Sequence, residues 1–93
     1  MTTINEFVKL DENGDAIIIL SKPLTIAGVK VAAMKMREPT VKDQLVMDAT
    51  EGTDAQKEIA FFATLTGQAP TDLHGLKSRD YRRLQAAFSL FTD

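Results

Sequence analysis

Hydrophobic and polar positions change their spacing once along this chain, close to residue 38. Before that point, apolar residues form short runs or alternate with polar ones, as in Met34-Lys35-Met36-Arg37, and this period of two is typical of β-strands. After it, apolar residues recur every three or four positions, which is the period of an α-helix. The pattern predicts an α+β fold with a β half over residues 15–37 and a helical half over residues 40–92.

The β half is predicted to form an N-terminal antiparallel β-hairpin or three-stranded sheet. Residues 17–20 are all apolar, so we expect helices, other strands or another chain to cover both faces of this strand. Pro23 is expected to end it, because proline cannot donate a hydrogen bond to a central ladder. Residues 24–26 and 29–37 are then predicted to form a second hairpin that turns at Gly28.

Residues 1–14 admit two interpretations. Asn13-Gly14 lies between two apolar runs and is a typical signal of a type I′ hairpin turn, which predicts a short first strand before it. Chain termini are also often loose unless other elements hold them, so a disordered tail is the alternative. The sequence leaves both open, within a chain of 93 residues that we expect to be a single domain.

Three C-terminal helices are predicted from apolar spacing and from capping residues. The first spans about residues 41–49, where Thr40 and Asp43 match a capping box. The second and third span about residues 55–66 and 79–91. The remaining caps are expected at Thr53 or Asp54, at Gly67 and at Ser78.

The second of these helices is apolar nearly all round. Phe61 and Phe62 are neighbours in the sequence and point about 100° apart on a helix, so one core face cannot easily take both. The helix is either buried centrally within the domain or carries a face for another chain. Both interpretations remain open from the sequence.

Composition limits the chemistry that the chain can perform. It has no cysteine and a net charge of -2, so thiolate chemistry is excluded and nucleic-acid binding is not expected. No run approaches the roughly 18 apolar residues that cross a membrane, and the first residues lack the pattern of a secretory signal. The only histidine, His74, has no partner at metal-ligand or catalytic spacing. We therefore expect no catalytic residues, no metal, no cofactor and a protein that is not an enzyme.

Four short motifs stand out along the chain. They are Leu20-Ser21-Lys22-Pro23, Met36-Arg37-Glu38-Pro39-Thr40, Leu65-Thr66-Gly67 and Asp80-Tyr81. Together they resemble the phage tail assembly chaperones of the contractile-tail, P2 E / Mu-like family, over about residues 16–91. The resemblance implies a fold with a β-rich start and a helical remainder.

The resemblance also implies a function in phage or prophage expression. Such a protein would bind the long, hydrophobic tape measure protein, keep it soluble and assist tail tube assembly, so the tail tube protein is a second candidate partner. It would act in the host bacterial cytoplasm and be absent from the mature virion. We expect the partner-binding surface to combine apolar side chains of the last two helices with a charged rim. Its residues would be Phe61, Phe62, Leu65, Phe88, Leu90 and Phe91, with Arg79, Arg82 and Arg83 as the rim.

Two other classes of protein also fit the sequence. The main rival is a small non-enzymatic adaptor or regulator that homodimerises by β pairing of residues 17–20 and has no chaperone role. A weaker rival is a nucleic-acid-binding regulator that uses the last helix. Tight dimerisation in light scattering would favour the first rival, and DNA binding at low salt would favour the second.

Overall fold

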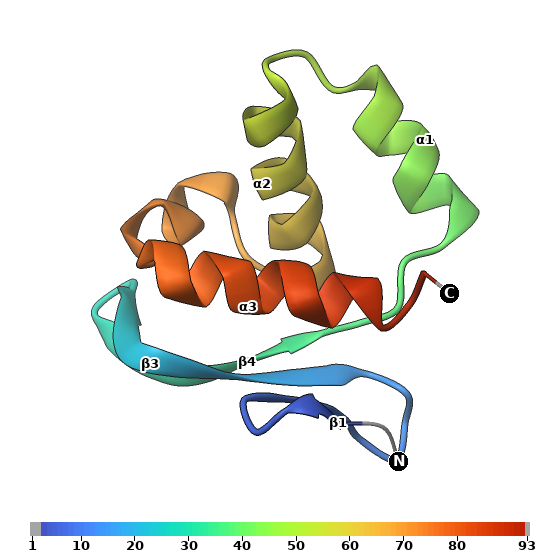
Figure 1. Cartoon of the computed structure of the whole chain (residues 1–93). Helices are drawn as coiled ribbons and strands as arrows, with labels where there is room; N and C mark the ends of the chain where they lie inside the picture. Colours follow the sequence, from blue (N-terminus) through green and yellow to red (C-terminus); the bar gives the residue numbers. More distant parts are fainter. Residues whose placement is uncertain (1–2, 93) are drawn as a thin grey trace.

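The computed structural model describes the backbone of residues 3–92 and the side chains of residues 6–92. Its strands form one antiparallel sheet in the order β1-β2-β3-β4, and the helices lie over one face of that sheet (Figure 1). The strands are β1 (Thr3–Asn5), β2 (Val8–Leu10), β3 (Ala16–Ile26) and β4 (Val29–Met36). The helices are α1 (Val41–Ala49), α2 (Asp54–Thr66), the 3-10 helix η1 (Pro70–Gly75) and α3 (Ser78–Ser89).

The predicted α+β class, with an antiparallel sheet followed by three α-helices, is confirmed. The sheet has more strands than expected, because β1 pairs with β2 and β2 pairs in turn with β3. The segment from residue 3 is therefore held in the sheet, which agrees with the strand interpretation of the N-terminal region. Residues 1 and 2 lie outside the described part of the chain.

β3 is an interior strand of the sheet, with β2 on one side and β4 on the other. Homodimerisation by β pairing of residues 17–20 would need an open strand edge, so this route of the adaptor hypothesis is wrong. The helices cover one face of β3, where Ile18 and Leu20 are buried. On the opposite face Ile17 is half-buried and Ile19 is exposed, so the expected cover on both faces is not found within the described residues.

β3 also continues past Pro23, which is contrary to the prediction. Its register with β4 shifts between Ile19 and Leu24, and the strand then runs on to Ile26. Proline is tolerated in such an irregular segment because its missing N–H has no ladder partner to lose. The result is one long, curved hairpin of β3 and β4 rather than two short hairpins (Figure 1).

The carboxylate of Asp80 in α3 binds the backbone of this irregular segment. It accepts hydrogen bonds from the N–H groups of Ser21 at 2.7 Å and Lys22 at 3.4 Å. Burial of Asp80 opposes its ionisation, but these two donors and the guanidinium of Arg83 outweigh that effect and hold the pKa of Asp80 below its ordinary value. Arg83 in turn donates to the carbonyl of Ile19 at 2.8 Å. α3 is thereby fixed to the sheet where the ladder of β3 is interrupted.

Of the turns between β2 and β3 and between β3 and β4, the second has the positive φ values that the sequence predicted for the first. Asn13 does not have the positive φ that a type I′ turn needs, although Gly14 has φ 85°. The Asp11 carboxylate instead accepts a hydrogen bond from the N–H of Asn13 at 2.9 Å and shapes the turn. Two positive φ values occur together at Ala27 (51°) and Gly28 (80°), which confirms the predicted hairpin turn at Gly28.

The helix ends follow the sequence signals at three positions and depart from them at one. Capping boxes form at Thr40 and Thr53, and α2 ends at Gly67 with φ 73°, as predicted. Ser78 does not cap α3, because it lies inside the helix and Lys77 occupies the N-cap without a side-chain hydrogen bond. The acid three residues after that cap is Asp80, and its carboxylate is used by β3 instead.

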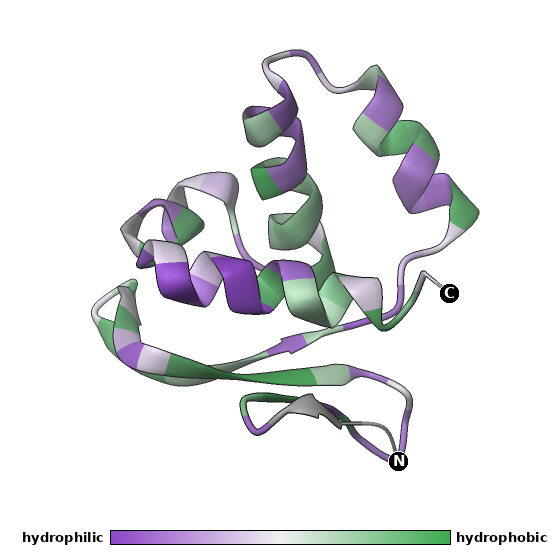
Figure 2. Cartoon of the chain, in the orientation of Figure 1, coloured by the Kyte–Doolittle hydropathy of each residue, from purple (hydrophilic) through white to green (hydrophobic). Residues whose placement is uncertain are grey.

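The core lies between the inner face of the sheet and helices α2 and α3. In Figure 2 most of β3 and the end of α2 nearest the sheet are coloured as apolar, whereas the first half of α3 is mostly polar. The buried apolar side chains are Val8, Ala16, Ile18, Leu20, Leu24, Met34, Met36, Phe61, Phe62, Ala63, Leu65, Leu73, Leu84 and Ala87. α1 contributes none of them, so it stands at the edge of the domain.

Candidate partner-binding surface

The aromatic side chains expected to contact a partner lie mostly in the core. Phe61, Phe62 and Leu65 are buried, and the Phe62 side chain is exposed by only 1%. The ring of Phe61 meets that of Phe88 edge-on with centroids 5.5 Å apart, and the ring of Phe62 lies 5.8 Å from that of Tyr81. α2 is therefore a central, largely buried helix, and these three side chains leave little of their surface to solvent.

A polar contact also joins α2 and α3. The Glu58 carboxylate accepts hydrogen bonds from the Tyr81 hydroxyl and, at 2.9 Å, from the Gln85 amide. Burial of the phenol raises the pKa of Tyr81, and the neighbouring negative charge of Glu58 raises it further. Tyr81 thus stays protonated and acts as a donor that aligns the two helices.

The remaining sequence-predicted residues lie at two separate ends of α3. Phe88, Leu90 and Phe91 are half-buried at its C-terminal end. Arg79 and Arg82 are exposed over its first half, and Arg79 lies roughly 14 Å from Phe88 along the helix axis at 1.5 Å per residue. Arg79 and Arg82 therefore lie toward the opposite end of α3 from the predicted aromatic residues.

α1 presents an apolar surface that the sequence analysis did not identify. The exposed fractions of Val41, Leu45 and Val46 are 77%, 63% and 54%, which are among the highest for large apolar residues in the described chain. We call these three residues the α1 surface. Their helical spacing was visible in the sequence, but spacing shows only that a helix has an apolar face and not whether that face points to the core.

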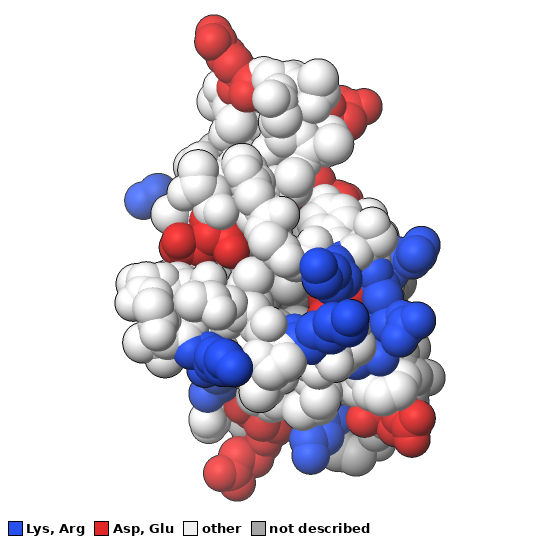
Figure 3. Space-filling view, turned by 90° about the vertical axis from the view of Figure 1, so that its left-hand side faces the viewer, with Lys and Arg blue, Asp and Glu red and all other residues white. Residues whose placement is uncertain are grey.

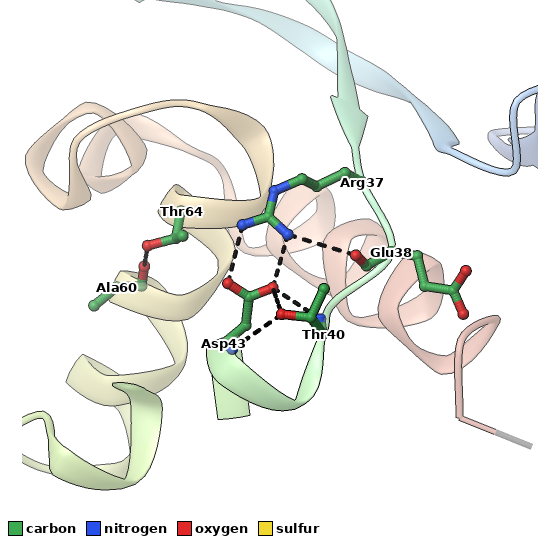
Figure 4. Close-up of polar contacts among 6 residues, drawn as sticks. All are labelled: Arg37, Glu38, Thr40, Asp43, Ala60 and Thr64. Carbon is green, nitrogen blue, oxygen red and sulfur yellow. Dashed lines mark hydrogen bonds and ion pairs between the residues drawn. The ribbon is translucent and has the colours of Figure 1, made fainter. Parts of the chain in front are cut away.

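α1 is held in place by polar contacts at its first turn (Figure 4). The guanidinium of Arg37 donates two hydrogen bonds to the Asp43 carboxylate, at 2.7 Å and 3.0 Å. The same carboxylate accepts from the N–H of Thr40 at 2.8 Å. These donors, Arg37 first, hold the pKa of Asp43 well below its ordinary value. α1 is therefore oriented by an ion pair that links it to the end of β4.

A small groove of about 80 Å³ separates α1 from α2. Figure 4 shows Ala60 and Thr64 of α2 beside the Arg37–Asp43 pair that borders it. The lining residues are Asp43, Val46, Met47, Thr50, Ala60, Phe61 and Thr64. Phe61 and Val46 both line the groove, so the mostly buried Phe61 borders it opposite one residue of the α1 surface.

The histidine and the acidic side chains of the described residues do not gather into a metal site. His74 is exposed, and within residues 6–92 no three His, Asp or Glu side chains lie close enough together to hold a metal ion. None of the helices in the described part combines the length and the apolarity that a membrane crossing requires. The fold is a small α+β structure that exposes apolar side chains on α1.

The chain belongs to the phage tail assembly chaperone family. A family model described as "Phage tail assembly chaperone proteins, E, or 41 or 14" matches residues 17–93, which confirms the resemblance seen in the sequence. No curated protein and no solved structure matches the chain. Family membership indicates a non-enzymatic role in tail assembly, with other proteins of that process as partners.

The motifs that carried the resemblance prove to be contacts that hold the fold together. The segment that contains Ser21 and Lys22 is bound by Asp80, so two motifs far apart in the sequence meet in the structure. Arg37 orients α1 through its ion pair, and Gly67 ends α2. These residues position the elements and leave the α1 surface free.

Proposed function

We propose that this chaperone binds the tape measure protein and assists the assembly of the tail tube around it. It acts in the host bacterial cytoplasm and does not remain in the mature virion. Membership in the tail assembly chaperone family supports a role in tail assembly. The resemblance noted from the sequence supports the tape measure protein as the partner. A long, hydrophobic partner needs apolar surface to bind, and the chain has such a surface on α1.

The α1 surface is the observation that carries this proposal. Apolar side chains stabilise a fold only when they leave water, so Val41, Leu45 and Val46 gain little within this chain. Burying one such side chain against a partner contributes about 1.5–3 kcal/mol. Three of them give roughly 5–9 kcal/mol, which is comparable with the cost of association of about 4–15 kcal/mol. Binding through α1 is therefore weak and reversible on its own, which suits a chaperone that has to release its partner.

The groove between α1 and α2 extends this surface toward the aromatic residues. A partner side chain that enters the groove meets the ring of Phe61 at its floor. The ring of Phe61 contacts that of Phe88. Phe88 lies near the C-terminal end of α3, close in sequence to the half-buried Leu90 and Phe91. In this proposal Phe62 and Leu65 support the surface from beneath and do not touch the partner.

The test compares two apolar residues that are equally exposed but lie on different elements. Leu45 lies on α1 and Val29 lies at the start of β4, and each is 63% exposed. Leu45→Asp and Val29→Asp should therefore both fold, which circular dichroism verifies. Each variant is co-expressed with affinity-tagged tape measure protein, and the amount of chaperone that co-purifies is measured.

We expect Leu45→Asp to reduce co-purification by about tenfold or more, a loss of about 1.4 kcal/mol, and Val29→Asp to leave it unchanged. The proposal is wrong if Leu45→Asp co-purifies as well as the unaltered chain does. It is also wrong if both variants lose the partner equally, because the apolar contact would then not be specific to α1.

A further inference from the structure

An open groove of about 500 Å³ is lined by residues of α3 and of the turn between β1 and β2. The first half of α3 lies on the side of the molecule away from α1 (Figure 1). Figure 3 views this side and shows basic side chains gathered on it. The groove is lined by Phe7, Arg79, Arg82, Arg83 and Ala86, and we call it the arginine groove. It combines apolar side chains with three guanidinium groups.

Arg83 lines the arginine groove and is held in place by several contacts. Its guanidinium stacks on the ring of Phe7, with the carbon 3.6 Å from the ring centroid, and donates to the carbonyl of Ile19 at 2.8 Å. It also lies 3.8 Å from the carboxylate of Asp80. These contacts hold the planar group in one orientation, so Arg83 is pre-organised and contributes part of the positive potential of the groove.

Arg79 and Arg82 are the accessible cations of the arginine groove. They are three residues apart on α3, which places them on neighbouring turns of the same side of the helix. Both are exposed, and none of the four ion pairs found among the described residues involves either of them. Two guanidinium groups are thus available to an incoming anion beside an apolar floor.

We propose that the arginine groove binds an acidic polypeptide segment, with carboxylates on Arg79 and Arg82 and an apolar side chain against Phe7 and Ala86. Arginine suits this role because its fork donates two parallel hydrogen bonds to one carboxylate. Phe7 and Ala86 add a second requirement, which is an apolar group on the ligand, and a free anion has no such group. The ligand is therefore a stretch of protein that carries acidic residues around at least one apolar residue.

The charges of the chain favour an acidic protein over a nucleic acid. Nucleic-acid binding depends on neutralising many phosphates, whereas the groove offers two accessible arginines and the whole chain has a net charge of -2. A protein segment presents fewer, more widely spaced charges that two arginines can match. The groove also lies apart from the α1 surface, so this inference does not depend on the proposed binding of the tape measure protein.

The test measures binding of a short fluorescein-labelled peptide that carries glutamates on both sides of a single leucine. Fluorescence anisotropy is recorded at low and at high salt with the full chain. The variants are Arg79→Glu with Arg82→Glu, the conservative Arg79→Lys with Arg82→Lys, and the control Lys42→Glu on α1. Circular dichroism establishes that each variant is folded.

We expect salt-dependent binding that weakens by about tenfold or more in the double glutamate variant, falls less in the double lysine variant and is unchanged in Lys42→Glu. A tenfold change corresponds to about 1.4 kcal/mol. The inference is overturned if the peptide does not bind, or if the double glutamate variant binds it as well as the unaltered chain does. It is also overturned if a DNA oligonucleotide of equal charge binds more tightly than the peptide.

Discussion

Replacing Asp80 by alanine tests whether one buried carboxylate fixes α3 to the sheet. The change leaves the N–H of Ser21, now bonded at 2.7 Å, without its acceptor. A hydrogen bond to a charged group contributes about 1.5–3 kcal/mol. The longer bond from Lys22 at 3.4 Å and the contact with Arg83 at 3.8 Å add less. We expect the free energy of unfolding to fall by about 2–4 kcal/mol, a large part of the 5–15 kcal/mol typical of a domain.

Urea denaturation followed by circular dichroism measures this loss, and the melting temperature should fall by roughly 4–8 °C per kcal/mol. Arg82→Ala is the control, because it alters an exposed residue of the same helix and should stay within about 0.5 kcal/mol. Asp80→Asn should lie between the two, since an amide oxygen can still accept from Ser21 but carries no charge. If Asp80→Ala is as stable as the control, the irregular segment of β3 does not depend on this carboxylate and the reasoning is refuted.

Two further predictions concern the packing of the core and the loss of folding stability at acidic pH. Phe62→Ala should lower the free energy of unfolding by about 3–5 kcal/mol, because its ring is fully buried; thermal denaturation measures this, and a loss under about 1 kcal/mol would contradict the burial. Folding lowers the pKa of Asp43 and of Asp80, so their contribution is complete above the ordinary carboxyl pKa of about 3.9 and is lost as the pH falls further. Urea titrations should therefore show stability falling only below about pH 4, less steeply in Asp43→Asn than in the unaltered chain; the same acid loss in Asp43→Asn would contradict a role for that carboxylate.

Local signals in the sequence predicted the parts of the fold that depend on neighbouring residues. Thr40 caps α1 because the acid it needs is three residues away, and Gly67 ends α2 because its own backbone takes the left-handed conformation. The change of apolar spacing near residue 38 likewise indicates directly that strands precede this point and helices follow it. These features need no knowledge of what packs against them.

Features that depend on distant residues were predicted incorrectly or not at all. Pro23 was expected to end a strand, yet the strand continues because Asp80 satisfies the backbone beside it. Ser78 was expected to cap α3, but the helix begins one residue earlier, with Lys77 at the N-cap and Ser78 in the first turn. A residue nearly sixty positions away contacts the irregular segment of β3, and short-range rules do not include such a contact.

The candidate sites show the same limit. The apolar spacing of Val41 and Leu45 was visible, but only the packing of α1 shows that their side chains face solvent. The arginine cluster was also visible, but its groove includes Phe7 from the turn between β1 and β2. Conversely, Phe61 and Phe62 were predicted to contact a partner because they are large and apolar, but they are buried and fill the core instead.

The contact between Asp80 and Ser21 joins residues 59 positions apart, and this separation affects how the chain folds during synthesis. At about 5–20 residues per second, a ribosome adds this length of chain in roughly 3–12 seconds. Until then Asp80 is not available to the amide groups of the irregular segment, and α3 does not yet cover the inner face of β3. Completion of the native state thus waits for one of the last helical turns to be translated.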